Sequence, residues 1–355
     1  MDAALSNLWS SSTYRLLAEG IPYRDISDVK ARTNEFKDWC RCWSELGQEA
    51  ERLGDAALER GFITTAAEEF RRASLAYFFG QFLFWHDPET KQIAYFECVR
   101  TFRRAVALID PPIIPVDIPF RGITMPGFLR LPRGATEPPC VLLLDGLDTT
   151  KEEHFALSSI CAQRGLAVLT FDGPGQGETF YKLKMSPGYE DAVRAAMDFA
   201  EKSPHVDGSR LGVIGRSLGS HYAPKVAAVD KRVKAVVSWG AMFDLLNYQS
   251  ISPQILAGFL YVTGSKSLEE AQPYIESINL RGHSGEITCP MMVVHGGRDR
   301  ITPPGHAELM TGEGRGPVEL LYWEDSIHCA HDRSHLCRPA MADFMRKHLG
   351  VSTSA

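Results

Sequence analysis

Short apolar runs alternate with helix-like segments between residues 140 and 323, and this alternation constrains the fold more than any other feature of the chain. The apolar runs are the strands that we expect, and they occupy residues 140–144, 167–171, 211–214, 235–239, 291–295 and 318–323. The first run is apolar at every position, which is typical of a strand buried on both faces. With helices between the strands, the pattern predicts an α/β fold, a mostly parallel sheet with helices on both faces.

Residues 1–112 have a different, helical pattern and predict a separate N-terminal domain. Thr65 and Glu68 have the spacing of a capping box at a helix start. A further helix is expected over residues 91–108, with Phe96 facing inward. A stiff linker with two prolines then leads into a second domain, 113–355, in which residues 241–286 interrupt the alternation as a helical cap insertion.

The N-terminal domain carries a dense aromatic stretch between residues 77 and 85. In one interpretation these rings form the core that joins the helices to the next domain. In the other, Tyr77, Phe82 and Trp85 bind the substrate by roofing a pocket for a flat aromatic ligand. The second interpretation makes the N-terminal domain part of the substrate pocket, and both stay open.

Composition and charge narrow the function. The chain has 355 residues, 8 cysteines and a formal net charge of −6, so it lacks the basic footprint of a nucleic-acid-binding protein. The cysteines lack the paired spacing of a zinc site, and we expect free thiols in a reducing compartment. The N-terminus has no secretory-signal pattern, and no apolar stretch approaches the ~20 residues that span a bilayer. We therefore expect a cytoplasmic protein that acts on a small molecule without a metal or cofactor.

Residues 215–219 read Gly-Arg-Ser-Leu-Gly and stand between an expected strand and an expected helix. Strand, Gly-x-Ser-x-Gly and helix, in this order, form the nucleophile elbow of α/β-hydrolases. Strand and helix nearly touch at such a turn, so the flanking positions must be small, and Gly215 and Gly219 meet that need. The pattern predicts Ser217 as a nucleophile and, together with the alternating strands, an α/β-hydrolase fold.

An aspartate and a histidine follow later strands, at the strand ends where α/β sheets carry their sites. Asp299 comes after the strand at 291–295, and His328 comes after the strand at 318–323. Serine, aspartate, histidine is the chain order of α/β-hydrolase triads. A serine hydroxyl needs a neighbouring base, so His328 is the expected base and Asp299 is expected to orient it.

Other residues compete for these roles. Asp244 follows the preceding strand and is a rival acid, ranked lower because the sequence His-Gly-Gly-Arg-Asp places Asp299 beyond a tight turn. His295, His331 and His335 are rival bases. His295 stands at a strand end before two glycines, which favours a structural role.

Two loops are expected to frame the reacting carbonyl. An oxyanion needs two backbone N–H groups, and Leu218, directly after the nucleophile, supplies one. Leu147, after the strand at 140–144, is expected to supply the other. The glycine-rich segment 172–177 lacks the Lys-Ser/Thr of a phosphate-binding loop, and we interpret it as a tight turn beside the site.

Residues 145–153, 171–178 and 215–219 resemble the α/β-hydrolase family that contains 2,6-dihydroxypseudooxynicotine hydrolase and fungal hydrolases that shorten polyketide chains. The resemblance extends into the helical N-terminal domain and so covers nearly the whole chain. It implies a serine hydrolase that can cleave a carbon–carbon bond next to a ketone, usually as a homodimer.

The resemblance also bears on single residues. Ser217, Asp299 and His328 match the family triad, and Asp148 stands where the nicotine-pathway enzyme has a glutamate, which keeps the acid but shortens its reach. We expect Ser217 to attack the carbonyl of an aryl ketone or a polyketide-like β-dicarbonyl compound and to form an acyl-enzyme. Asp148 is a candidate to position the ketone or to relay a proton to the leaving carbon.

Two other functions stay open. Hydrolysis of an ester, lactone or thioester, or acyl transfer, needs the same triad but no second acid. Asp148 would then cap the helix that starts near Lys151, a role that Thr149 or Thr150 can also fill. A binding protein on an inactive hydrolase fold is the third possibility, and the intact triad argues against it.

Overall fold

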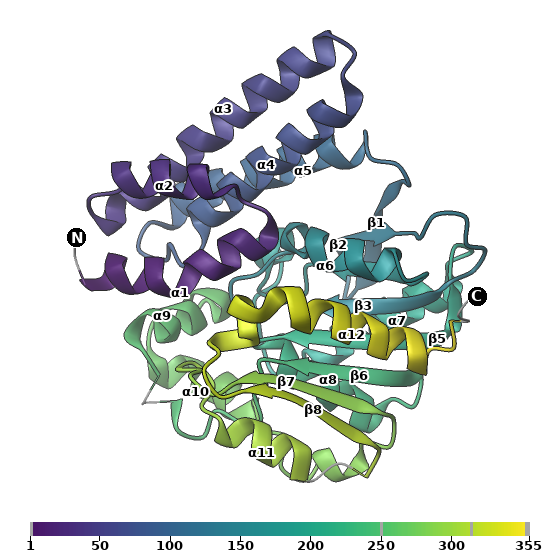
Figure 1. The fold of residues 1–355 in the computed structure, drawn as a ribbon. Helices are drawn as coiled ribbons and strands as arrows, with labels where there is room; N and C mark the ends of the chain where they lie inside the picture. Colours follow the sequence, from purple (N-terminus) through teal and green to yellow (C-terminus); the bar gives the residue numbers. More distant parts are fainter. Residues whose placement is uncertain (1–2, 249–250, 313–314, 352–355) are drawn as a thin grey trace. The chain divides into compact units, whose positions relative to one another are not determined.

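The computed structural model describes residues 3–248, 251–312 and 315–351. The chain forms two compact units, Met1–Ile114 and Pro115–Ala355 (Figure 1). The division falls just after the two prolines of the expected linker. Within the described ranges, no helix is both long and apolar enough to cross a bilayer.

The first unit is helical. Its helices are α1 (Ala3–Glu19), α2 (Tyr23–Arg32), the short 3₁₀ helix η1 (Phe36–Asp38), α3 (Trp39–Glu59), α4 (Ile63–Gln81) and α5 (Pro88–Val106). Helix α4 packs against both α3 and α5. Aromatic rings dominate the core, and the largest fully buried ones are Trp9, Trp39, Trp43, Phe70, Phe78 and Phe79. Burial of such large apolar groups is the main term that stabilises a small helical unit.

Two local predictions for this unit are wrong. The capping box at Thr65 does not form because α4 begins earlier, at Ile63, after a left-handed turn at Gly61. Phe96 does not face inward, since it is 41% exposed. Tyr95 is buried, and successive residues on a helix are rotated by about 100°, so Phe96 falls on the outer face of α5.

The second unit is built on one eight-stranded sheet in the order β1-β2-β4-β3-β5-β6-β7-β8. The strands are β1 (Ile113–Phe120), β2 (Ile123–Arg130), β3 (Pro139–Leu144), β4 (Ala167–Phe171), β5 (Asp207–Arg216), β6 (Val233–Trp239), β7 (Met291–Gly296) and β8 (Val318–Trp323). Strand β2 pairs antiparallel with β4, whereas all pairs from β4 to β8 are parallel. The predicted mostly parallel α/β fold is confirmed.

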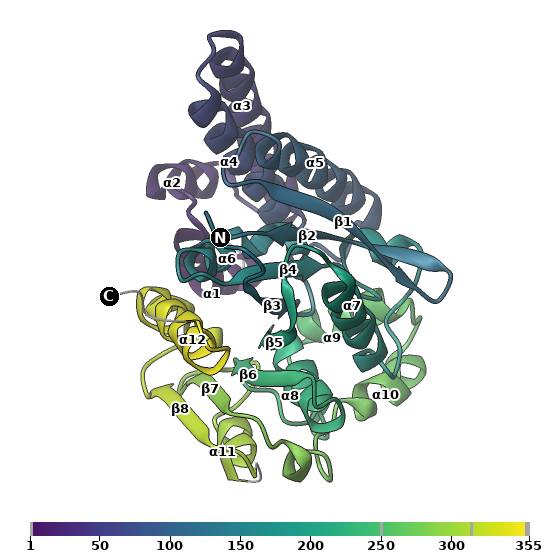
Figure 2. The ribbon, with the colours of Figure 1, turned by 90° about the vertical axis from the view of Figure 1, so that its right-hand side faces the viewer.

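Helices cover both faces of this sheet (Figure 2). Helices α6 (Phe155–Ala162) and α12 (Ser334–His348) pack together on one face, and α7 (Glu190–Lys202) and α8 (Gly219–Val229) pack together on the other. Every residue of β3, β4 and β7 is buried as a result. Polar groups are therefore concentrated in the loops at the strand ends, where α/β sheets bind their ligands.

Between β6 and β7 the chain forms α9 (Pro253–Thr263), α10 (Leu268–Ser277) and η5 (Ser284–Glu286). They belong to the expected cap insertion 241–286, of which residues 249 and 250 lie outside the described part. The shorter pieces are η2 (Lys151–His154), η3 (Gly177–Tyr181), α11 (Gly305–Gly312) and η6 (His328–Arg333). Of these, η2, η3 and η6 follow strands β3, β4 and β8, at the edge that carries the predicted site residues.

Candidate active site

Ser217 stands on a sharp turn between β5 and α8. Its φ is 55°, in the left-handed region that non-glycine residues rarely adopt. A Cβ on Gly215 would lie 1.8 Å from the carbonyl oxygen of Gly219, and a Cβ on Gly219 would lie 2.6 Å from that of Leu144. Only glycine fits at these two positions, so the turn has the close strand–helix approach of a nucleophile elbow.

A hydrogen-bonded chain joins Ser217, His328 and Asp299, which stand after β5, β8 and β7. His328 Nε2 lies 2.9 Å from Ser217 Oγ, and His328 Nδ1 lies 2.6 Å from Asp299 Oδ2. An ionised carboxylate can only accept, so Nδ1 donates to Asp299 and the neutral ring leaves Nε2 free to accept the serine proton. The structure thus brings these three predicted residues together in the geometry that activates a serine hydroxyl.

Further hydrogen bonds hold the Asp299 carboxylate. Its Oδ1 accepts from the amides of Ile301 and Thr302, each at 2.9 Å, and its Oδ2 accepts from Thr302 Oγ1 at 2.8 Å. Burial acts to raise the pKa of Asp299, but the charge of His328 and these hydrogen bonds bring that pKa below its usual value. Burial acts to lower the pKa of His328, and the Asp299 charge outweighs it, so that pKa is raised. The pair therefore stabilises an imidazolium at this position.

Two glycines bring the acid loop close to the base loop. A Cβ on Gly296 would lie 2.3 Å from the carbonyl oxygen of Ile327, and a Cβ on Gly297 would lie 2.4 Å from that of Glu324. The chain after β7 therefore packs directly against the backbone that leads into η6. This close approach is the physical reason for the sequence His-Gly-Gly-Arg-Asp that pointed to Asp299.

The rival residues have other surroundings. The Oδ2 atom of Asp244 lies 3.1 Å from Arg281 Nη2, so this carboxylate is paired with an arginine. His295 is fully buried within β7, His331 is also buried, and His335 is exposed on α12. His295 Nε2 lies 4.0 Å from Asp299 Oδ2, beyond hydrogen-bond distance, whereas His328 Nδ1 is hydrogen-bonded to that oxygen.

The end of β6 supports the nucleophile and the base together, and the sequence patterns did not reveal it. The amide of Ser217 donates to the carbonyl of Trp239 at 2.8 Å, and the indole Nε1 of Trp239 donates to the carbonyl of Cys329. A Cβ on Gly240 would lie 2.4 Å from Cys329 Sγ. In the sequence this site is visible only as Trp239-Gly240 at a strand end. That pair does not indicate a supporting role until its contacts with Ser217 and Cys329 are known.

The loop after β3 lies against the nucleophile. A Cβ on Gly146 would lie 3.2 Å from the Cβ of Ser217, so the backbone of this loop passes directly beside the serine. Leu147 is the next residue in this loop. Leu218 is the N-cap residue of α8, and an N–H at the start of a helix has no acceptor within that helix. Both expected oxyanion donors therefore belong to segments that flank Ser217.

The glycine-rich segment 172–177 is a tight turn, as its composition indicates. A Cβ on Gly173 would lie 2.2 Å from the hydroxyl of Tyr189. Gly177 has a φ of 44°, and its Cβ would lie 2.1 Å from the carboxylate of Asp172. Side chains of the protein thus pack where a phosphate would have to approach these glycines.

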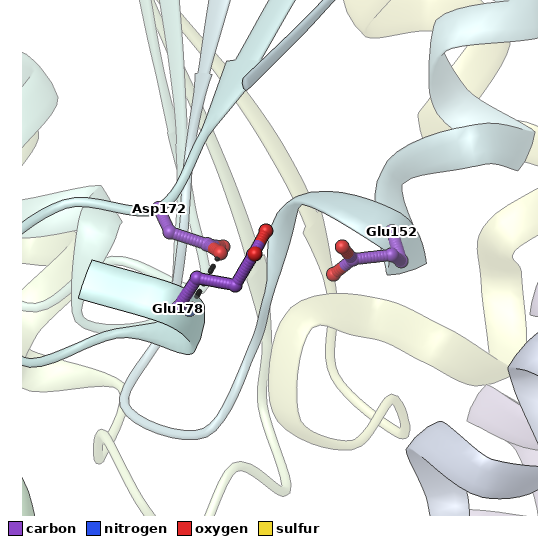
Figure 3. A group of neighbouring side chains, drawn as sticks. All are labelled: Glu152, Asp172 and Glu178. Atoms are coloured by element: carbon purple, nitrogen blue, oxygen red, sulfur yellow. Dashed lines mark hydrogen bonds between the residues drawn. The ribbon is translucent and has the colours of Figure 1, made fainter. Parts of the chain in front are cut away.

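A buried ion cluster lies where the loops after β3 and β4 meet. Glu152, Asp172 and Glu178 have the spacing of a metal site, and Figure 3 shows their carboxylates converging. The ammonium of Lys151 lies 2.7 Å from Glu152, 2.6 Å from Asp172 and 2.8 Å from Glu178. A lysine in contact with all three carboxylates supplies the positive charge that a cation would supply, so the cluster fits a structural anchor and does not fit a metal ion.

Two more buried pairs anchor the loop after β3. Arg216, just before the nucleophile, pairs with Glu153 and donates to Thr149 Oγ1 at 3.1 Å. His154 Nε2 lies 2.7 Å from Asp145 Oδ1. Burial and the nearby charge of Asp172 raise the pKa of Asp145. Sequence reasoning missed these partners because Arg216 and Glu153 follow different strands, and because no local pattern pairs Asp145 with His154.

Asp148 is half-buried in the same loop, and its charge affects the pKa of two tyrosines, Tyr181 and Tyr261. Tyr181 belongs to η3, and Tyr261 belongs to α9 of the cap insertion. Burial raises the pKa of both phenols, the Asp148 charge raises each further, and the two hydroxyls are hydrogen-bonded to each other. The Phe180 ring stacks on Tyr261 at 4.3 Å. Asp148 therefore belongs to a polar group that the insertion helps to form.

The start of η2 has its own cap arrangement. Thr150 is the N-cap residue, and its side chain makes no capping hydrogen bond; its hydroxyl donates to Glu152 at 2.6 Å. The amide of Lys151 donates to Asp172 Oδ1 at 3.0 Å instead. Asp172, from the loop after β4, thus accepts a hydrogen bond at the start of η2, where the sequence led us to expect a cap from Asp148, Thr149 or Thr150.

The three aromatic residues predicted to bind the substrate lie in the helical unit. Tyr77 and Phe82 are part of its hydrophobic core, and the Tyr77 ring is so close to α3 that a Cβ on Gly47 would lie 2.8 Å from it. The Lys91 ammonium lies 4.2 Å from the centre of the Trp85 ring. These surroundings agree with the core interpretation of Tyr77 and Phe82, and substrate binding by the three residues stays a prediction.

Comparison with known proteins agrees with this geometry. The model of the FrsA-like esterase family matches residues 38–280. The chain belongs to the FrsA-like esterase family. It is therefore a hydrolase of the α/β-hydrolase fold, and the expected resemblance is confirmed.

Members of this group resemble the chain over different lengths. The chain is 32% identical to "2,6-dihydropseudooxynicotine hydrolase" of Paenarthrobacter nicotinovorans, over 93% of this chain and 90% of that protein. A crystal structure of 2,6-dihydroxy-pseudo-oxynicotine hydrolase superposes with a TM-score of 0.88 and 30% identity, over 96% of this chain and 97% of the other. The fungal α/β-hydrolase pydG of an Acremonium species is 32% identical over 62% of this chain but only 56% of its own length.

Proposed function

We propose that Ser217, His328 and Asp299 are the catalytic triad of a serine hydrolase that cleaves a carbon–carbon bond next to a ketone. The hydrogen-bonded chain of these residues on a nucleophile elbow carries the proposal. The substrate is an aryl ketone or a polyketide-like β-dicarbonyl compound. Similarity over most of the chain to 2,6-dihydropseudooxynicotine hydrolase supports this substrate class.

The first half of the reaction forms an acyl-enzyme. Ser217 Oγ bonds to the ketone carbon while His328 Nε2 takes the hydroxyl proton, and the carbonyl electron pair moves onto its oxygen. The N–H groups of Leu147 and Leu218 donate to that oxyanion. When the oxyanion collapses, the carbon–carbon bond breaks and its electron pair leaves with the departing carbon. That carbon takes up the proton that His328 carries, directly or relayed by Asp148, so His328 is neutral again.

The second half releases the acid. Water attacks the ester carbon on Ser217 while His328 takes one of its protons, and the same two N–H groups hold the second oxyanion. Collapse expels the serine oxygen, which regains its proton from His328. One water is consumed, and the products are a carboxylic acid and the protonated leaving group.

The carbon leaving group gives Asp148 its proposed role. An alkoxide can take its proton directly from His328, whereas a carbon leaving group is harder to expel and stands in a different place. Asp148 follows Leu147 in the oxyanion loop, and its charge acts on Tyr181 and Tyr261. We assign it the positioning of the ketone or the relay of the proton from His328 to the leaving carbon, a contribution of about 10²–10⁴ in rate.

Hydrolysis of a carboxylic ester, lactone or thioester is the second candidate, and acyl transfer is its variant when water is excluded. The description of the matching family as esterase favours it. This chemistry uses the same triad and the same oxyanion donors, but it does not need Asp148.

A side-by-side assay tests the proposal. Purified protein and its Ser217→Ala variant are given a panel of aryl ketones and aryl β-diketones, and separately p-nitrophenyl acetate, and Ser217 is examined for an acyl adduct by mass spectrometry. We expect the wild-type protein to cleave a ketone and the ester, and the variant to cleave neither. Cleavage of esters alone would favour the second candidate, and full activity in a folded Ser217→Ala protein would contradict both.

A further inference from the structure

The carbonyl of Gly146 has a buried hydrogen-bond donor on one side. Gln176 Nε2 donates to this oxygen at 2.8 Å, and Gln176 is only 2% exposed. In a trans peptide, the C=O of one residue and the N–H of the next point in opposite directions. This bond therefore fixes the plane of the peptide between Gly146 and Leu147, and the Leu147 N–H points away from Gln176.

A second residue decides which end of the Gln176 amide faces Gly146. The hydroxyl of Tyr189 donates to Gln176 Oε1 at 2.5 Å, so the NH₂ end is left to face the carbonyl. The Tyr189 ring is held by stacking on Tyr222, with the ring centres 4.1 Å apart. Both Tyr189 and Gln176 are buried, which leaves neither side chain room to reorient.

The glycine-rich turn after β4 makes this arrangement possible. The hydroxyl of Tyr189 approaches Gly173 so closely that a Cβ there would lie 2.2 Å away. Gly175, with a φ of 76°, reverses the chain directly before Gln176. The turn thus brings the tyrosine hydroxyl and the glutamine amide together. This contact gives the glycine-rich segment a role, which the chemistry of the triad does not.

We propose that Gln176 is a positioning residue that orients the Leu147 N–H as an oxyanion donor, and that Tyr189 sets the orientation of Gln176. The inference rests on the proposed function, because it assigns Leu147 to the oxyanion site. Neither side chain contacts the reacting atoms in this role. Both act through the peptide plane beside Ser217.

Loss of the Gln176 donor has a defined physical consequence. The Gly146 carbonyl would be buried without a hydrogen-bond donor, which costs free energy. The peptide would therefore tend to rotate until this carbonyl meets another donor. Glycine resists such a rotation less than any other residue. Rotation would aim the Leu147 N–H away from the oxyanion. Burial raises the pKa of Tyr189 well above its usual value, so its hydroxyl stays a donor at ordinary pH.

The test uses Gln176→Met, which keeps the length of the side chain and removes its amide. Turnover of p-nitrophenyl acetate gives kcat and KM. Affinity for trifluoroacetophenone, whose serine adduct carries an oxyanion, is compared with affinity for acetophenone, which serves as the analogue with little tendency to form the adduct. We expect kcat to fall about 10-fold to 100-fold, less than the ~10²–10³ lost with an oxyanion donor itself, with KM nearly unchanged. Trifluoroacetophenone affinity should fall in parallel, and acetophenone affinity should not.

Two tyrosine variants separate positioning from packing. Tyr189→Phe removes the hydroxyl that orients Gln176 and should lower kcat with the same selectivity but by a smaller factor. Tyr222→Phe removes the neighbouring hydroxyl, which is hydrogen-bonded to Tyr274 instead, and should leave kcat near the wild-type value. If Gln176→Met does not fold, Tyr189→Phe decides the question alone.

The outcomes distinguish this inference from the proposed function. Wild-type kcat and inhibitor affinity in folded Gln176→Met, or in Tyr189→Phe, would overturn the inference, as would a change in KM alone. Such a result would leave the serine mechanism intact as long as Ser217→Ala is inactive. Full activity of Ser217→Ala would overturn the proposed function itself.

Discussion

The two sides of the candidate site are built differently. On the base side, the loops after β7 and β8 bring Asp299 and His328 to Ser217 through side chains that bond directly to one another. On the oxyanion side, the loops after β3 and β4 place backbone beside the nucleophile, and buried side chains such as Gln176 and Lys151 hold that backbone from behind.

The difference follows from the chemistry that each side is proposed to supply. Proton transfer needs titratable side chains within reach of the reacting atoms. Stabilisation of an oxyanion needs N–H groups that are already in place when the charge forms. Residue identity therefore matters most on the base side, and the rigidity of the support matters most on the oxyanion side.

The largest effect is expected for the residue that both sides share. Ser217→Ala removes the nucleophile and should lower kcat by about 10⁶, because the remaining site can bind but cannot form an acyl-enzyme. The measurement is turnover of ester and ketone substrates, with circular dichroism to establish folding. A folded variant with substantial activity would show that the reaction does not use Ser217. His328 and Asp299 would then have no serine to activate, and the contrast between the two sides would not hold.

The base side should depend on one particular carboxylate. Asp299→Asn should lower kcat by about 10⁴, because the amide favours the wrong tautomer of His328. Asp244→Asn is the matched control, since this aspartate is paired with Arg281 and should affect kcat little. If Asp244→Asn is the crippled variant and Asp299→Asn is not, the acid has been assigned to the wrong strand end.

Asp148 tests whether the oxyanion side also carries an acid. Asp148→Asn should lower ketone cleavage by about 10²–10⁴ and spare p-nitrophenyl acetate, because only the carbon leaving group needs the additional acid. Asp148→Glu keeps the carboxyl group and should retain part of the ketone activity. Equal losses on both substrates would indicate a structural role for Asp148, and no loss on either would favour the ester or lactone reaction.

Support of the oxyanion side should appear as stability. Lys151→Met leaves Glu152, Asp172 and Glu178 together without their cation and should lower the free energy of unfolding by about 3–5 kcal/mol. Burial raises the pKa of Glu152 to about 7 even with Lys151 present, and loss of that charge should raise it further. A carboxylate whose folded pKa is raised favours the folded state at low pH, so the deficit should grow as pH rises through neutrality.

Urea unfolding at several pH values measures that deficit. Lys347→Met is the control, because this lysine pairs with Glu319 on the surface, with 69% and 51% of the two side chains exposed. Such a pair contributes at most about 1 kcal/mol. A Lys151→Met protein as stable as the control would mean that the buried cluster does not anchor the loop.

The smallest effect concerns the pH dependence of the base side. Only neutral His328 can take the serine proton, and the Asp299 charge raises the His328 pKa above its ordinary 6.5. Ester kcat/KM should therefore rise with pH, with its inflection above 6.5. In Asp299→Asn the residual activity should have its inflection at lower pH, and an unshifted profile would show that Asp299 does not set this pKa.

Local patterns predicted the elements that local physics controls. The residues of β4 and β8 agree with the expected ranges because strands are short, mostly apolar runs between breakers, although only β4 is buried throughout. The start of α4 and the outward position of Phe96 were missed because a helix can begin at several nearby residues, and tertiary packing selects one of them. The stretch around Tyr77 left core and pocket interpretations open, because an aromatic ring suits either.

The sequence by itself determined the sheet, the elbow and the order of Ser217, Asp299 and His328 at the strand ends. Those features follow from apolar periodicity, from glycines at a tight turn and from the rule that parallel strands end at one edge. Only the tertiary structure decided which residues pair: Ser217 with His328 across 111 positions, and Gln176 with Gly146 across 30. Contacts between distant buried side chains depend on how the loops pack together, and no local periodicity encodes that packing.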